Sequence, residues 1–190
     1  MIKLGTEPKT GGVPTLRCSD VKPGFIALSG IRKVSEEIES EYVRTRLFGG
    51  EVLINIRGIL GGVAKVPDSM DDYNVAREVA VIPISFKLDG DYIVYVMLSP
   101  YFWETIQENL RGIAYKGLNL GTLREFLVPL PPLAEQRRIV AKVDELMALC
   151  DRLEESLAAG NDTCCRLLDA LLVEALAPQE GHEQVAWVAA

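Results

Sequence analysis

The chain has 190 residues, of which 48% are hydrophobic and 25% are charged, so it is long enough to bury one sizeable core. It contains no uninterrupted apolar run of the roughly 18–20 residues that cross a bilayer, and no secretory signal follows Met1, which predicts a cytoplasmic protein without membrane contact. The four cysteines lack CxxC spacing and the only histidine is His182, so no metal site is expected.

The net charge of −7 is unevenly distributed along the chain. Residues 1–131 carry 15 Lys and Arg against 16 Asp and Glu, and the remaining residues carry 5 against 11. Affinity for nucleic acid depends largely on cations placed against phosphates, so an acidic chain at first argues against DNA binding. Because most of the excess acidity follows residue 131, the first region can still present a basic surface.

Short β-branched and aromatic runs, bounded by Gly, Pro, Asp and Ser, characterise residues 1–131. They predict strands at 15–18, 25–28, 52–57, 79–84 and 126–128. Two amphipathic helices are expected between them, at 36–46 with Ser35 as N-cap and at 92–110. The second is expected to restart at Pro100, because proline suits a first helical turn and disrupts an interior. These elements predict a mixed α+β domain over residues 1–131.

A long helical pattern follows Pro129-Leu130-Pro131-Pro132 and occupies the region 132–177. Its apolar residues alternate steps of four and three, which is typical of a coiled-coil seam. About 44 helical residues make a rod near 65 Å long, so the seam cannot be covered by its own domain and is expected to pack on a partner helix. The seam residues are Ile139, Val143, Leu146, Leu153, Leu157, Leu167 and Leu171.

Two features qualify this helix. Gly160-Asn161-Asp162 are poor helix formers, so a kinked but continuous helix is expected, with a hairpin that folds back at this position as the alternative. Residues 178–190 lack periodicity and are expected to form a flexible tail, in which Val185, Trp187 and Val188 are available to dock onto a neighbour.

Several residues before the prolines have the chemistry for reading DNA, in which Arg or Lys pairs with guanine and Asn or Gln with adenine. Arg57 is the first candidate because it ends a strand just before a glycine-rich turn; an ordinary strand-end arginine is the alternative. Asn119 is a candidate for contact with a base edge, and a simple turn residue is the favoured alternative. The full set of candidate DNA-binding residues is Arg17, Arg32, Lys33, Arg57, Asn74, Arg77, Lys116 and Asn119.

No catalytic residue is identified. The glycine-rich segment 58–62 lacks the Lys and Ser or Thr of a phosphate-binding loop, and no Asn-Pro-Pro-Tyr motif of a methyltransferase is present. Asp68, Asp71 and Asp72 could suggest a metal nuclease, but no lysine partner accompanies them and a solvated acidic loop explains them better.

The junction has the sequence Leu130-Pro131-Pro132-Leu133-Ala134-Glu135-Gln136-Arg137-Arg138-Ile139-Val140-Ala141-Lys142-Val143-Asp144-Glu145-Leu146. This segment strongly resembles the one that joins a target-recognition domain to its conserved helix in specificity subunits of type I restriction-modification systems. Three further segments resemble the entry strand, the central strand with its glycine turn, and the approach to the linker of the same family. They are residues 12–21, 49–58 and 117–123, so the resemblance spans nearly the whole chain.

The resemblance implies a function. Members of this family usually carry two recognition domains and two conserved helices, and each domain reads one half of a bipartite DNA site. This chain has one of each, so it is expected to be a natural half-length subunit, with a fragment of a two-domain subunit as the alternative. As a half-length, non-catalytic subunit it would pair as a homodimer through its helix. Methyltransferase and restriction subunits are the implied partners, and they rather than this chain would hold S-adenosylmethionine, ATP and magnesium. The competing hypotheses are an adaptor or oligomerisation module that binds no DNA, and an independent nuclease.

Overall fold

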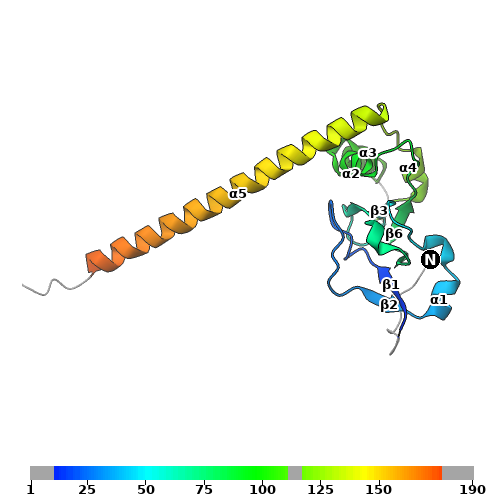
Figure 1. Ribbon diagram of the computed structural model, residues 1–190, viewed down its shortest axis with the longest axis horizontal. Coiled ribbons are helices and arrows are strands. Elements are labelled where there is room, and N and C mark those ends of the chain that lie inside the picture. Colours follow the sequence, from blue (N-terminus) through cyan, green and yellow to red (C-terminus); the bar gives the residue numbers. More distant parts are fainter. Residues whose placement is uncertain (1–10, 111–116, 177–190) are drawn as a thin grey trace, which may run out of the picture. The chain divides into compact units, whose positions relative to one another are not determined.

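The computed structural model describes residues 11–110 and 117–176. Strands and helices alternate along the domain, and one long helix follows it (Figure 1). In chain order the elements are β1 (Val13–Leu16), β2 (Arg32–Val34), α1 (Glu36–Ser40), η1 (Val43–Thr45), β3 (Val52–Asn55), β4 (Val63–Lys65), η2 (Asp68–Met70), β5 (Asn74–Val75), β6 (Val79–Ile82), α2 (Gly90–Leu98), α3 (Pro100–Leu110), α4 (Leu120–Glu125) and α5 (Leu133–Leu176).

Two three-stranded sheets form the framework of the domain. The first has the order β2-β1-β5, in which β1 is antiparallel to β2 and parallel to β5. The second has the order β4-β3-β6 and is antiparallel throughout. All four residues of β3 are buried, which explains why its sequence, Val-Leu-Ile-Asn, is an almost continuous apolar run rather than an alternating one.

The apolar residues of the domain gather in two clusters. The first lies between the β4-β3-β6 sheet and the helices α2 and α3, and Ile54 and Phe102 in it are fully buried. The second joins the two sheets, with Leu16 and Leu53 fully buried. Figure 1 shows this arrangement as β3 and β6 placed between α2 and α3 on one side and β1 and β2 on the other. The structure therefore confirms the α+β class.

Hydrogen bonds fix the start of α5 to the domain. The side-chain Oε1 of Gln136 accepts from the backbone N–H of Asp89 at 2.9 Å, and its Nε2 donates to the carbonyl of Pro131 at 2.8 Å. Tyr92 donates its hydroxyl proton to the carbonyl of Pro129 at 2.7 Å. Because these bonds join α2 to the proline linker and the first turn of α5, the compact unit extends to Ala141, beyond the proline segment where the sequence pattern changes.

The helix α5 runs without interruption from Leu133 to Leu176, a span of 44 residues. Gly160 lies inside it, and a Cβ at this position would meet no atom within 4 Å. The hairpin alternative is therefore wrong. A single glycine costs a helix roughly 1 kcal/mol relative to alanine, which is too little to end one with helical sequence on both sides.

Two of the five expected strands are not strands. Residues 25–28 form a turn in which only an isolated bridge between Val21 and Ile26 is present, because Pro23-Gly24 reverses the chain and Gly24 adopts a φ of +84°. Residues 126–128 pair with no strand among the described residues, since α4 and the prolines bound this short segment.

The helix expected at 36–46 is divided into α1 and η1. Ser35 has extended backbone but makes no capping hydrogen bond through its side chain. Between the two pieces, the carbonyl of Tyr42 accepts from the side chains of Thr45 and Asn74. The backbone N–H of Thr45 also donates to this carbonyl at 3.0 Å in a 3₁₀ bond, and the bond from Asn74 adds a tertiary contact.

The sequence pattern also missed five short elements, namely β2, β4, η2, β5 and α4, of which three are strands of two or three residues. The break between α2 and α3 is confirmed, since Pro100 is the first residue of α3. Within residues 11–110 and 117–176, none of the helices combines the length and the apolar character needed to span a bilayer.

Candidate nucleic-acid interface

Four turns of the domain converge where β1, β3 and β5 end and β6 begins. Three backbone hydrogen bonds of 2.8 Å tie them together: the N–H of Ala76 donates to Leu16, that of Ile56 to Glu78, and that of Leu118 to Ile56. We call this surface the arginine edge and define it as residues 17–28, 56–62, 76–78 and 117–119.

Arg57 is exposed at the centre of the arginine edge. It directly follows β3, and its backbone is held on both sides, by a bond of 3.3 Å to the carbonyl of Glu78 and by a bridge to Gly117. No ion pair of its side chain is recorded among the described residues. A guanidinium fixed at its base and open at its tip can make the paired hydrogen bonds that suit a guanine edge or a phosphate.

Arg17 belongs to the same edge but is already paired within the protein. Its guanidinium donates to both carboxylate oxygens of Asp20, at 3.2 and 3.1 Å, and to the carbonyl of Gly30 at 3.0 Å. Asp20 is buried while the arginine side chain keeps 27% of its surface exposed. The arrangement suits a residue that stiffens the first turn and still offers part of its charge to solvent.

Arg77 and Asn119 complete the edge. Arg77 is exposed, and its nearest carboxylate oxygen, on Glu78, lies 3.9 Å away, which is a weak pairing. Asn119 caps α4, because its Oδ1 accepts from the N–H of Gly121 at 2.9 Å. The turn-cap alternative for Asn119 is therefore confirmed. Its contact with a base remains a prediction.

Glycines allow the turns of the edge to pack closely. A Cβ on Gly62 would lie 2.2 Å from both the Asn55 side-chain nitrogen and the carbonyl of Val21. Gly58 has a φ of +76°, and a Cβ there would lie 3.1 Å from the sulfur of Cys18. The buried Asn55 donates to the carbonyls of Cys18 and Val21, at 2.9 and 3.1 Å. These glycines thus serve turn-to-turn packing.

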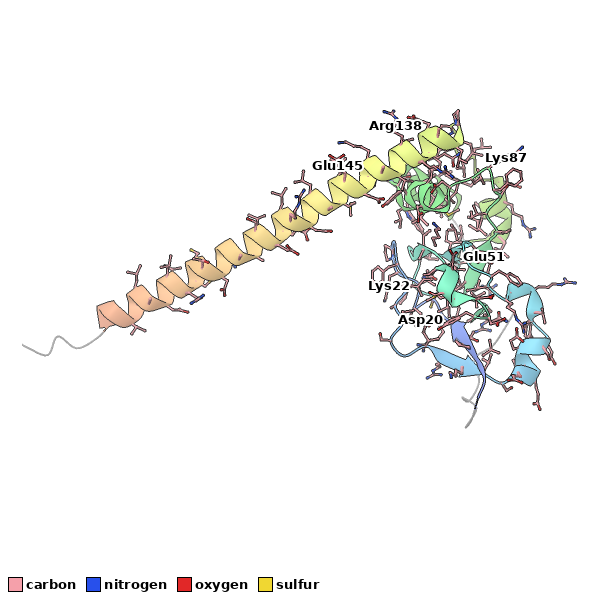
Figure 2. All side chains as sticks on the ribbon, viewed as in Figure 1. Asp20, Lys22, Glu51, Lys87, Arg138 and Glu145 are labelled. Carbon is pink, nitrogen blue, oxygen red and sulfur yellow. The ribbon has the colours of Figure 1, made fainter. Side chains whose placement is uncertain are left out.

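The turn at 22–28 is a part of the edge that sequence reasoning missed. Phe25, Leu28 and Ile59 are exposed by 60%, 64% and 61%, and the N–H of Gly24 donates to the carbonyl of Val63 at 2.8 Å. Figure 2 shows Asp20 and Lys22 of this region on the part of the domain that holds β1. The Pro23-Gly24 pair was the signal for a turn, but the apolar residues after it were interpreted as a strand.

Asn74 is a correction to the candidate set. Its side chain is fully buried, where Oδ1 accepts from the hydroxyl of Thr45 at 2.6 Å and Nδ2 donates to Glu39 at 3.2 Å. Arg46 donates to both oxygens of Glu39, at 2.9 and 2.6 Å. The hydrogen bond from Arg46, together with its charge, outweighs burial and holds the pKa of the Glu39 carboxyl below its ordinary value. Asn74 is therefore a structural residue beneath the surface.

The other candidates lie elsewhere. Arg32 and Lys33 are exposed on β2, opposite Thr15 and Pro14 of β1, so they flank the arginine edge rather than forming part of it. Lys116 lies outside the described residues.

The seam residues of α5 differ in their exposure. Leu146, Leu153 and Leu157 are 49%, 55% and 73% exposed, and Leu167 and Leu171 are both 60% exposed. Ile139 is a correction, because it is half-buried and packs against the core of its own domain. Val143 is half-buried. The seam open to a partner thus begins after the first three turns of the helix.

Among the described residues, no group of three or more His, Cys, Asp or Glu is placed to hold a metal ion. The structure presents two exposed surfaces, namely the guanidinium groups of the arginine edge and the apolar stripe of α5. The first suits a polyanion and the second suits another helix. These two surfaces are the candidate interfaces of the chain.

The comparisons with known proteins identify the family. Residues 2–159 match the model of the type I restriction modification DNA specificity domain. Since the match covers most of the chain, the chain belongs to this family, as the junction segment had indicated.

Relatives and solved structures agree with this assignment. The chain is 30% identical over 165 residues to the type I restriction enzyme EcoBI specificity subunit of Escherichia coli, covering 86% of the chain and 35% of that protein. It is 27% identical over 180 residues to the EcoKI specificity subunit of Escherichia coli strain K12, covering 90% and 39%. The HsdS subunit from Thermoanaerobacter tengcongensis shares the fold, with a TM-score of 0.72 at 22% identity over 93% of this chain and 46% of that one.

The chain spans less than half the length of these relatives. Within residues 11–110 and 117–176 the chain has one α+β domain and one long helix.

Proposed function

We propose that this chain reads one half of a bipartite DNA target through the arginine edge and pairs with a second copy through α5. The observation that carries the proposal is the convergence of Arg17, Arg57 and Arg77 on three adjoining turns, although they are far apart in the sequence. A second copy related by a two-fold axis would present the same edge again, and the pair would read an inverted repeat.

The edge offers separate groups for positioning and for sequence readout. Arg57 is the candidate for a base edge, since its backbone is held by two neighbouring turns while its side chain is exposed. Arg32 and Lys33 on β2 are placed to contact phosphates beside it. Exposed apolar side chains such as Phe25 and Ile59 could contact thymine methyl groups.

The helix provides the scaffold in this proposal. Its exposed leucines from Leu146 onward would pair with a second α5, and the pair would carry the methyltransferase and restriction subunits. Methyl transfer and cleavage would take place on those subunits, with S-adenosylmethionine, ATP and magnesium bound there. A solved structure at 21% identity describes complex assembly of the type I restriction-modification system, and its resemblance to this chain supports the shared fold.

The contributions of Arg57 and Arg77 to DNA binding can be measured by titration. The chain and its modification subunit are titrated against the duplex that they enrich from a random pool, at several salt concentrations. Arg57→Ala should weaken binding about 10- to 100-fold, because one bidentate base contact contributes roughly 1–3 kcal/mol of discrimination. Arg77→Ala should weaken it less and reduce the salt dependence by about one counterion.

Lys87→Ala is the matched control. Lys87 is exposed and basic, but it follows the far end of β6, since Val79 pairs with Asn55 next to the arginine edge and Ile82 pairs with Val52 at the other end. Figure 2 shows Lys22 and Lys87 at well separated places on the domain. A loss for Lys87→Ala equal to that for Arg57→Ala would contradict the proposed interface.

A further inference from the structure

An apolar groove of about 570 Å³ follows β6 on the domain. Its walls come from β6 and the residues after it, from α2, from α4 and from the linker to α5. Figure 1 places β6 and α4 on the same side of the domain. Representative lining residues are Ala80, Ile82, Ile84, Met97, Leu123 and Leu130.

The outer side of β6 is only partly open to a further strand, because the N–H of Val79 already donates to the carbonyl of Ala76 at 3.0 Å and Pro83 has no N–H. In the sheet order β4-β3-β6, this strand pairs with β3 on one side and is the last strand on the other. An edge strand offers unpaired N–H and C=O groups that an extended segment can use, while apolar pockets beside it take alternate side chains. Among the described residues of β6, Val81 is the position left to donate outward, so an extended segment could use this one N–H and fill the groove with alternate apolar side chains.

Two arginines lie at the groove, Arg44 of η1 and Arg124 of α4. Both are exposed, and no ion pair is recorded for either among the described residues. An occupant with apolar side chains and neighbouring carboxylates would match this combination, since each carboxylate would meet a guanidinium at the rim.

The tail of this same chain has that composition. Glu180 and Glu183 are followed by Val185, Trp187 and Val188. In an extended segment Val185 and Trp187 lie on one face, two residues apart, and could enter the groove together.

If α5 is straight and continuous, its length keeps the tail from its own groove. The 44 residues of α5 span about 65 Å, and α5 begins three residues after Leu130 of the groove. From Leu176 to Trp187 the chain reaches at most about 40 Å, at roughly 3.6 Å per residue. Only a second copy can receive the tail while α5 remains continuous.

We propose that residues 180–188 of one copy dock along β6 of a second copy. This inference rests on the pairing through α5 proposed above, and it requires the two helices to run antiparallel, because a parallel pair would leave each tail about 65 Å from either groove. The charges of α5 favour the antiparallel arrangement. Residues 133–143 contain Arg137, Arg138 and Lys142 against one Glu, whereas residues 151–174 contain six Asp and Glu against two Arg.

Photo-crosslinking in the full chain tests the proposal. Trp187 is replaced with p-benzoylphenylalanine, unlabelled chain is mixed with ¹⁵N-labelled chain, and the crosslinked peptides are identified by mass spectrometry. We expect crosslinks from position 187 to residues 79–84 and 120–130, in pairs that combine a labelled and an unlabelled chain. Crosslinks confined to single chains, or located outside the groove, would overturn the proposal.

Charge variants show whether the groove itself binds the tail. Arg44→Glu with Arg124→Glu should reduce the crosslinking yield at least about fivefold, and Glu180→Arg with Glu183→Arg in the tail should restore it. Lys87→Glu, an exposed change of the same sign outside the groove, should leave the yield unchanged. An equal loss for Lys87→Glu would overturn the proposal.

A second crosslinker position separates this inference from the proposed function. Leu157→p-benzoylphenylalanine should produce crosslinks between α5 helices. If these form while position 187 misses the groove, tail docking alone is wrong. If neither forms, the pairing through α5 is wrong as well.

Discussion

The α+β domain and the distal part of α5 differ in how far their large apolar side chains are buried. Ile54 and Leu53 in β3 are fully buried, whereas Leu157 in α5 is 73% exposed. The domain can be stable by itself because it covers its apolar side chains with its own elements. The distal helix covers few of its own, and under the proposed pairing a second copy would cover them.

The largest expected effect is a loss of domain stability. Ile54→Ala should lower the free energy of unfolding by about 2–5 kcal/mol, because it leaves a cavity in the cluster between β3 and α2. Urea unfolding followed by Trp103 fluorescence measures this change. Leu157→Ala serves as the control and should leave the unfolding of the domain nearly unchanged. An equal loss of unfolding free energy in Ile54→Ala and Leu157→Ala would contradict the difference in burial between the domain and the distal helix.

Substitutions in the exposed seam of α5 should weaken self-association and leave the stability of the domain unchanged. Leu153→Lys combined with Leu157→Lys should weaken self-association at least about 100-fold, since each leucine contributes roughly 1.5–3 kcal/mol when buried. Sedimentation velocity measures the oligomer, and the fluorescence of the domain should be unaffected. An unchanged oligomer would show that this seam is not the interface.

The junction between the two regions depends on one buried amide. Gln136→Ala should lower the free energy of unfolding by about 1–3 kcal/mol, because the N–H of Asp89 and the carbonyl of Pro131 would both lose their partner. Arg137→Ala, an exposed change at the adjacent position, should cost much less. Thermal unfolding of both variants at one concentration tests this difference.

The smallest effect should appear at acid pH. The folded-state pKa of Glu39 is lowered below 4.5, so the unfolded chain binds its proton first as the pH falls. Its contribution to stability is present above about pH 4.5 and is lost as the pH falls through the lower folded-state value. Glu39→Gln should therefore flatten the decline of stability in this window, whereas the exposed Glu37→Gln should keep it. Urea midpoints between pH 3 and 6 provide the measurement.

The sequence predicted the long-range organisation better than the local detail of the domain. The heptad pattern predicted α5, and Pro100 predicted the start of α3, because both signals are strong and local. The strands β2 and β5 were missed, since two or three residues carry no clear periodicity. Their existence depends on pairing with β1, which is a tertiary contact.

In the candidate site, too, the sequence predicted what local signals determine and missed what tertiary contacts determine. Arg57 and Arg77 were proposed from their place beside strands and turns, and the structure brings their segments together. Asn74 was proposed on the same reasoning, but its buried bonds to Glu39 and Thr45 depend on residues about 30 positions earlier. A single sequence does not reveal such pairings. The interruption of the helix at 36–46 follows from the same contacts.

The central claim is that one domain reads half a target and α5 brings two such domains to one DNA. The most direct test is to select a randomised duplex pool with the chain and its modification subunit at near-physiological salt, and to sequence the bound fraction. We predict a short motif repeated in inverted orientation at one fixed spacing. A bound pool with no enriched motif, or a motif that occurs only once per duplex, would contradict the account.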